Sequence, residues 1–192
     1  MQLWDKTKYK LAVPEWCLPG DGIFSLQMAS SLGLDGVQLE AGFYETGFKL
    51  GHPWVQHLYR EAAAQYGLEL ISIVMNDLDR HGLRHGRGTE FGDIAYEGLD
   101  IALEAAAAME IPVLMIPSFL NNDMRTEQDV EHTIEALQYA SDRAPPNGIT
   151  IATETAIDAK ALEQLFARVD RKNLRLFYDS ENYRCFRGYP PM

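Results

Sequence analysis

Short apolar runs alternate with longer amphipathic segments along the whole chain. Four times, a helical segment ends at a short break and an apolar run follows, in MASSLGLDGVQLE, REAAAQYGLELISIVM, LEAAAAMEIPVLMIP and YASDRAPPNGITIATE. The pattern predicts strands near residues 10–16, 36–40, 69–75, 112–117, 149–154 and 174–179. Residues 113–117 are apolar at every position, which is typical of strands that a parallel sheet buries on both faces.

The segments between these strands have the spacing of amphipathic helices. One face of the helix predicted over residues 93–109 carries Ile94, Leu99, Ala102 and Ala106. Thr126 and Asp129 precede an apolar run with the spacing of a capping box, so a helix is predicted to begin there.

Strict alternation of strands and helices requires a parallel sheet with right-handed crossovers. A doubly wound sheet of the dinucleotide-binding type needs a G-x-G-x-x-G turn after its first strand, whereas this chain has PEWCLPGDGIF. A closed barrel needs eight strand–helix units, and we count six strands and five complete helices. The sequence therefore predicts an α/β, TIM-barrel-like (β/α) fold that is incomplete. It would be a single domain over residues 1–192, lacking its last two units at the C-terminus.

Composition and charge exclude some classes of function. With 46% hydrophobic and 23% charged residues, the chain resembles soluble globular proteins. A net charge of -11 opposes nucleic-acid binding, and no apolar run is long enough to span a membrane. The N-terminus lacks a secretory signal, so a cytoplasmic location is expected. Cys17 and Cys185 are too few for a disulfide framework and are expected to be free, buried thiols.

Polar side chains follow most of the predicted strands, where parallel α/β folds place their chemistry. Glu154 and Asp179 end two consecutive apolar strands, so their carboxylates are expected to converge. Two buried anions repel each other, and a divalent cation with oxygen ligands would relieve the repulsion. The alternative is that each carboxylate caps a helix or pairs with an arginine.

Five further residues are candidates for contacts with a polar substrate: Glu40, Asn76, Asn182, His85 and Trp16. Asn182 lies three residues beyond Asp179 and could turn back toward the metal or substrate. Trp16 follows the first strand and would line the pocket or lie in a surface turn. His85 belongs to the long Gly-rich loop NDLDRHGLRHGRGTEFG, whose basic residues could recognise a phosphate or carboxylate. The histidines of this loop are expected mainly at the surface.

Taken in order, GVQLE, IPVLMIP, TIATET and YDSEN resemble the xylose-isomerase-like TIM-barrel superfamily. That superfamily includes sugar isomerases and epimerases, inosose dehydratases and apurinic-site endonucleases. The resemblance implies that Glu154 and Asp179 are two of four metal ligands. The other two, a His and a Glu on later strands, have no counterpart in this chain. Asp179 would begin a D-x-x-H motif, whose histidine is replaced by Asn182.

The resemblance implies a metal-dependent isomerase or epimerase of a small sugar or polyol-derived ketone. A Mn²⁺ or Mg²⁺ ion would stabilise an ene-diolate, and Glu154 would be the catalytic base. An inosose-type dehydratase shares this chemistry. A third possibility is an inactive, truncated barrel that binds a ligand or forms a homo-oligomer covering its open edges. The endonuclease branch is disfavoured, because Asn76 and Ser118 stand where those enzymes have zinc-binding histidines.

Overall fold

In the part of the chain that the structure describes, six parallel strands form one sheet in the order β1-β2-β3-β4-β5-β6, so spatial order follows chain order. The computed structural model describes residues 9–20, 22–144 and 148–188. The strands are β1 (Ala12–Pro14), β2 (Gly36–Glu40), β3 (Glu69–Val74), β4 (Val113–Ser118), β5 (Thr150–Thr155) and β6 (Leu174–Leu176). This arrangement is a barrel-like sheet that does not close, and it confirms the predicted fold class.

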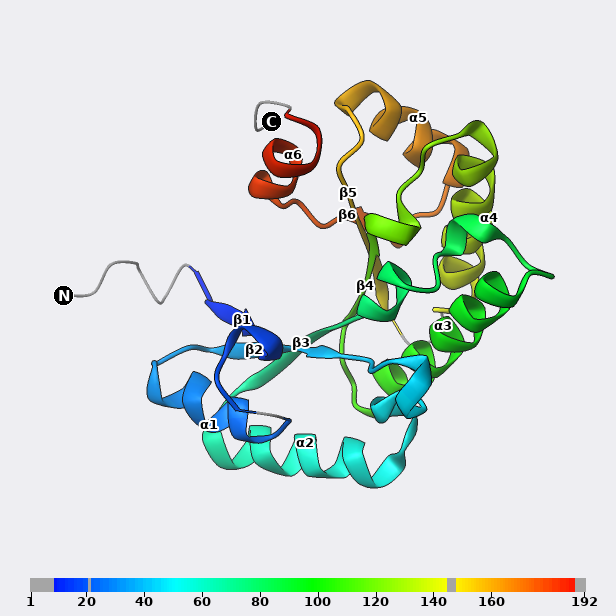
Figure 1. Ribbon diagram of the computed structural model, residues 1–192. Coiled ribbons are helices and arrows are strands. Elements are labelled where there is room, and N and C mark those ends of the chain that lie inside the picture. Colours follow the sequence, from blue (N-terminus) through cyan, green and yellow to red (C-terminus); the bar gives the residue numbers. More distant parts are fainter. Residues whose placement is uncertain (1–8, 21, 145–147, 189–192) are drawn as a thin grey trace.

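Helices connect the strands and lie around one side of the sheet (Figure 1). They are α1 (Phe24–Ser31), α2 (Pro53–Tyr66), α3 (Glu90–Ala108), α4 (Glu127–Arg143) and α5 (Ala159–Val169), and a further helix, α6 (Ser180–Arg187), follows β6. The predicted capping box is confirmed at the start of α4, where Thr126 and Asp129 bond each other's backbone N–H groups. None of the described helices is long and apolar enough to cross a membrane.

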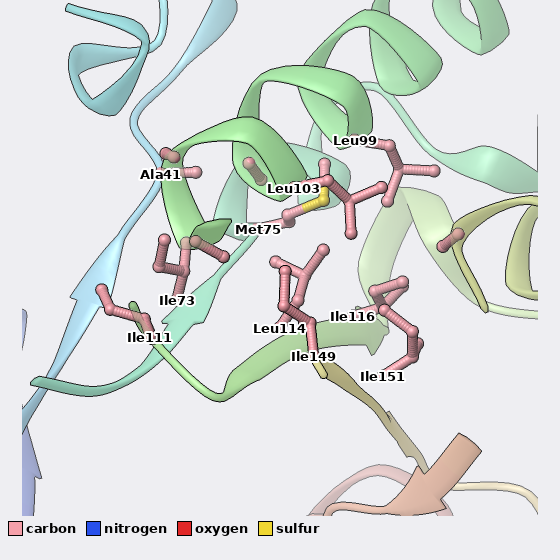
Figure 2. Close-up of a cluster of buried hydrophobic side chains, with 14 of the residues drawn as sticks. Ala41, Ile73, Met75, Leu99, Leu103, Ile111, Leu114, Ile116, Ile149 and Ile151 are labelled. Atoms are coloured by element: carbon pink, nitrogen blue, oxygen red, sulfur yellow. The ribbon is translucent and has the colours of Figure 1, made fainter. Parts of the chain in front are cut away.

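The hydrophobic core lies between the sheet and these helices. Figure 2 shows strand residues such as Ile73, Leu114 and Ile151 beside Leu99 and Leu103 of α3. Because side chains alternate across a strand, the residues between them point to the opposite, concave face. That face is more polar. On it, Gln38 of β2 reaches past β3 to donate a hydrogen bond to the Met115 sulfur of β4, over 3.3 Å.

The details differ from the sequence-based expectations at several points. Both edge strands have only three residues, because β1 ends at Pro14 and β6 at Leu176. Cys17 and Cys185 are free, as expected, but both are exposed rather than buried. His81, expected at the surface, is buried because its ring lies between Tyr44 and Phe91 and is hydrogen-bonded to Asp77.

Core packing leads to a stability prediction. Leu114 is 0% exposed, so Leu114→Ala should lower the free energy of unfolding by about 2–5 kcal/mol through lost burial and a cavity. Leu58→Ala is the control, because Leu58 is 41% exposed on α2 and should cost about 0.5 kcal/mol or less. Urea denaturation measures both values. Equal losses in the two variants would contradict the position of the core.

Candidate active site

Glu154 is the buried centre of the candidate site. It lies at the end of β5, opposite Pro117 of β4 in the parallel register, and its position in the strand directs it to the concave face. Its side chain is 5% exposed. The amide Nδ2 of Asn182 donates a hydrogen bond to Glu154 Oε1 over 2.7 Å. Asn182 therefore turns back to the carboxyl groups, as its spacing from Asp179 suggested.

Asp179 lies beside Glu154 and is fixed by the start of α6. Its Oδ1 accepts hydrogen bonds from the backbone N–H groups of Glu181, at 2.7 Å, and Asn182, at 3.1 Å. Asp179 is thus a helix cap, which was one of the two expectations from the sequence. The two carboxyl groups also converge, because Asn182, whose backbone N–H bonds Asp179, donates its side-chain amide to Glu154, and the negative charge of Asp179 acts on Glu154. One short turn of chain therefore positions Asp179 and Asn182 against the same glutamate.

The surroundings of Glu154 favour its protonated form. Burial, followed by the negative charge of Asp179, raises the pKa of Glu154 from 4.5 to about 7, and the Asn182 hydrogen bond opposes the rise. A carboxyl group with a pKa near neutrality can both accept and return a proton. Functional groups that exchange protons with substrates are often tuned in this way.

A third carboxyl group, Asp79, belongs to the same electrostatic environment and was missed from the sequence. It ends the short 3-10 helix η4 (Asn76–Asp79) that follows β3. Burial raises the pKa of Asp79 from 3.8 to about 6, and its charge also raises the pKa of Glu154. The sequence signal was present, since Asp79 lies in the loop that follows a buried strand, but nothing local distinguishes it from Asp77.

A second polar group lies at the ends of β1 and β2. Glu40 Oε1 accepts a hydrogen bond from Asn76 Nδ2 over 2.8 Å, so two of the predicted substrate-binding residues are neighbours. Behind them, Glu15 is buried and accepts bonds from the Glu40 backbone N–H, from Lys49 Nζ at 2.7 Å and from the Tyr59 hydroxyl at 2.5 Å. Glu15 thereby holds the end of β2, and with it Glu40.

The remaining predicted residues lie elsewhere. Trp16 is on the 3-10 helix η1 (Glu15–Cys17) and is 45% exposed. His85 is on η5 (Leu83–His85), with its ring 5.3 Å from that of Phe91. Burial, and then the charge of Arg84, lowers the pKa of His85. The structure does not place Trp16 or His85 in the hydrogen-bonded group around Glu154.

The carboxylate oxygens at this site suit a hard cation, but they come from only two residues, Glu154 and Asp179. Glu154 and Asp179 offer carboxylate oxygens side by side, and such ligands suit Mg²⁺ or Mn²⁺. Within the described residues, no three His, Cys, Asp or Glu side chains lie close enough together to hold a metal ion. The two carboxylates therefore fit as part of a metal site, with other ligands required to complete it.

A curated relative and two solved structures are similar to this chain. The 2-epi-5-epi-valiolone 7-phosphate 2-epimerase of Actinoplanes sp. is 26% identical over 173 residues, which are 90% of this chain and 62% of that protein. The chain thus spans less than two thirds of this relative's length. D-psicose 3-epimerase of Clostridium cellulolyticum H10, solved with D-tagatose, gives a TM-score of 0.75 at 12% identity, covering 94% of this chain and 67% of that one.

The second solved structure is a xylose isomerase-like TIM barrel protein of Mycobacterium smegmatis in complex with magnesium. It gives a TM-score of 0.72 at 15% identity, over 94% of this chain and 68% of that one. At such identities the two solved structures support the fold alone. The model of the xylose isomerase-like TIM barrel family matches residues 26–191, which is most of the chain, and we conclude that this protein belongs to that family.

Proposed function

We propose that this chain carries the catalytic glutamate of a metal-dependent isomerase or epimerase acting on a small sugar or sugar-derived ketone. The observation that carries the proposal is the environment of Glu154. Its carboxyl group is buried at the carboxyl end of β5, hydrogen-bonded by Asn182 and adjacent to Asp179. The Actinoplanes relative is, by its name, an epimerase of 2-epi-5-epi-valiolone 7-phosphate, which agrees with this reaction class.

In this proposal Glu154 removes the proton from the carbon next to the substrate carbonyl. In the metal-free chain its pKa of about 7 suits a group that accepts a proton and returns it to the adjacent carbon, as isomerisation requires. Epimerisation would need, in addition, a second acid that protonates the same carbon from its opposite face. Asn182 donates to Oε1, which leaves Oε2 as the oxygen that can take the proton. Asp179 is held by the backbone of α6, so its charge stays beside Glu154 without reorganisation.

Substrate hydroxyl groups have partners at the ends of β2 and β3. Asn76 uses one amide hydrogen on Glu40, which leaves its second amide hydrogen and its carbonyl oxygen for other partners. The Glu15 network keeps Glu40 in place. Glu40 and Asn76 are therefore our candidates for binding the polyol part of the substrate.

A divalent cation, Mg²⁺ or Mn²⁺, would be held by Glu154 and Asp179 together with ligands from outside this pair. When bound, it would supply Lewis-acid stabilisation of the charge that develops on the carbonyl oxygen. The same enolate chemistry would serve an inosose-type dehydratase, which differs in expelling a hydroxyl group. The epimerase name of the Actinoplanes relative favours isomerisation or epimerisation.

A second candidate role is binding to another copy of the chain. Phe24, Met28 and Leu32 form a solvent-exposed apolar stripe along α1, with 69%, 36% and 59% of each residue exposed. Their spacing of four residues places them on one helical face. In the described part of the chain, β1 pairs with β2 alone and its other edge is open. We infer a homo-oligomer in which a second copy covers this stripe and edge.

Metal binding tests the principal proposal. Glu154→Gln and Asp179→Asn each remove one anionic oxygen ligand, so Mn²⁺ should bind each variant at least about 10-fold more weakly than the parent. Isothermal titration and elemental analysis measure the affinity and the metal content. Glu163→Gln, an exposed change on α5, serves as the control. Unchanged Mn²⁺ affinity in both active-site variants would overturn the metal site.

The pH dependence of stability tests the state of Glu154 in metal-free protein. Its folded pKa of about 7 lies above its usual value of 4.5, so the folded chain binds the proton more tightly than the unfolded chain. The resulting stabilisation is full below pH 4.5 and is lost as the pH rises through about 7. Glu154→Gln should flatten this decline, leaving a smaller decline from Asp79, whose folded pKa is about 6.

Urea denaturation at pH 5.5 and pH 8, with a chelator present, measures this dependence. The parent should lose more stability between the two values than Glu154→Gln does. Identical losses would show that Glu154 titrates normally.

Sedimentation tests the inferred oligomer. The double substitution Phe24→Gln and Leu32→Gln should shift the protein from a dimer or larger species to the monomer at micromolar concentration, because it removes the apolar contact of α1. Trp54→Gln on α2, a residue that is 66% exposed, should leave the mass unchanged. A parent protein that is monomeric at every concentration would contradict the inference.

A further inference from the structure

Asp79, which is not one of the two proposed metal ligands Glu154 and Asp179, has an unusual carboxyl group. Its Oδ1 is buried and has no hydrogen-bond partner, and no other carboxyl oxygen of the described residues has this property. A buried acceptor without a donor costs about 1–3 kcal/mol, and more when it is charged. A folded chain retains such a group when a partner arrives later or when the local backbone permits no alternative.

The backbone on both sides of Asp79 is anchored by hydrogen bonds and close packing. Asp77, two residues earlier, bonds the His81 ring at 2.9 Å and accepts from the backbone N–H of Tyr44 at 3.0 Å. Asn121 Nδ2 donates to the Arg80 carbonyl over 3.1 Å. Gly82 packs so closely that an added Cβ would collide with the Asn121 carbonyl. These contacts fix the backbone on both sides of Asp79.

The nearby cations are engaged with other groups. Arg80 pairs with Glu45 at 3.1 Å and stacks over the Phe43 ring. Arg84 donates to the Asn121 carbonyl and pairs with Asp129 at 3.5 Å. The charge of Asp79 instead acts on Glu154. The helix η4 follows β3 and packs against β4 and η6 (Leu120–Asn122), so Asp79 lies at the edge of the sheet where the parallel strands β3, β4 and β5 end.

We propose that Asp79 is a substrate-binding residue, whose buried Oδ1 accepts a hydrogen bond from a hydroxyl group of the ketone that reacts at Glu154. The proposal rests on the function proposed above and makes it more specific. A hydroxyl group is the donor that a polyol substrate provides, and a site built to accept such a bond discriminates against analogues without it. Asp79 is then a specificity-determining residue at the β3 end of the site.

Binding of a ketohexose tests this role separately from metal binding. D-tagatose is the probe, and its affinity is measured by isothermal titration with Mg²⁺ present. Asp79→Ala should weaken D-tagatose binding about 10-fold, because one hydrogen bond to a charged acceptor is lost. Its Mg²⁺ affinity should stay within about 2-fold of the parent, unlike that of Glu154→Gln. Glu90→Gln, an exposed change at the start of α3, is the matched control.

The outcomes distinguish a failure of the Asp79 role from a failure of the proposed function. If Asp79→Ala binds D-tagatose as tightly as the parent, the role of Asp79 is overturned and the proposed function stands. If its Mg²⁺ affinity falls as far as that of Glu154→Gln, Asp79 is a metal ligand and the present role is also overturned. If the parent binds neither Mg²⁺ nor D-tagatose, both proposals fail.

Thermal stability without ligand provides a second readout. Asp79→Asn removes a desolvated charge, so it should raise the Tm at pH 8 by about 2–4 °C. A carboxylate with a structural role would instead lose its partners, and the Tm would fall. A lower Tm in Asp79→Asn would therefore overturn the substrate-binding role. Glu90→Gln should leave the Tm unchanged.

Discussion

The parallel ladder between β4 and β5 is the constraint on which the site depends. It is the longest continuous register in the sheet, pairing Val113 through Ser118 with Thr150 through Thr155. Since side chains alternate along a strand, this register fixes which residues face the helices and which face the concave side. Ile116 and Ile151 join the core, whereas Glu154 points the other way. A slip of one residue would exchange these roles, placing a carboxyl group in the core.

Two buried glutamates, Glu15 and Glu154, differ in the number of hydrogen-bond donors around their carboxyl groups. Glu15 is surrounded by donors, because Lys49, Tyr59 and a backbone N–H all bond its carboxylate. Glu154 is equally buried but has one neutral amide as donor and two other carboxyl groups nearby. Glu15 therefore has a structural role, because hydrogen bonds from within the chain compensate for the burial of its carboxylate. The burial of Glu154 is left uncompensated, as expected of a group that awaits a cation or a substrate.

The sequence predicted the architecture well because its strongest signals are local and repeated. Apolar strands, helix breaks and the Thr126 capping box each depend on a few adjacent residues. Strand order predicted that Glu154 and Asp179 converge, and the spacing from Asp179 predicted that Asn182 turns back toward the site, but the hydrogen bond from Asn182 to Glu154 itself was not predicted. The sequence could not distinguish Asp79 from Asp77, because the difference arises from η4 packing onto β4 and η6. The burial of His81 was not predicted either, because it also depends on tertiary packing: Tyr44 and Phe91, which contact its ring, come from other segments of the chain.

Asn182, which stands where the family resemblance implies a histidine, has a chemical consequence for the proposed site. A histidine there could carry a charge or exchange a proton with Glu154 near neutral pH. The Asn182 amide can only donate and accept hydrogen bonds, and its donation to Oε1 partly offsets the rise in the pKa of Glu154. Proton transfer on this side of the site therefore falls to carboxyl groups alone. Burial first, and the negative charge of Asp179 second, raise the pKa of Glu154 and so set the pH range over which it could act as a base in the proposed reaction.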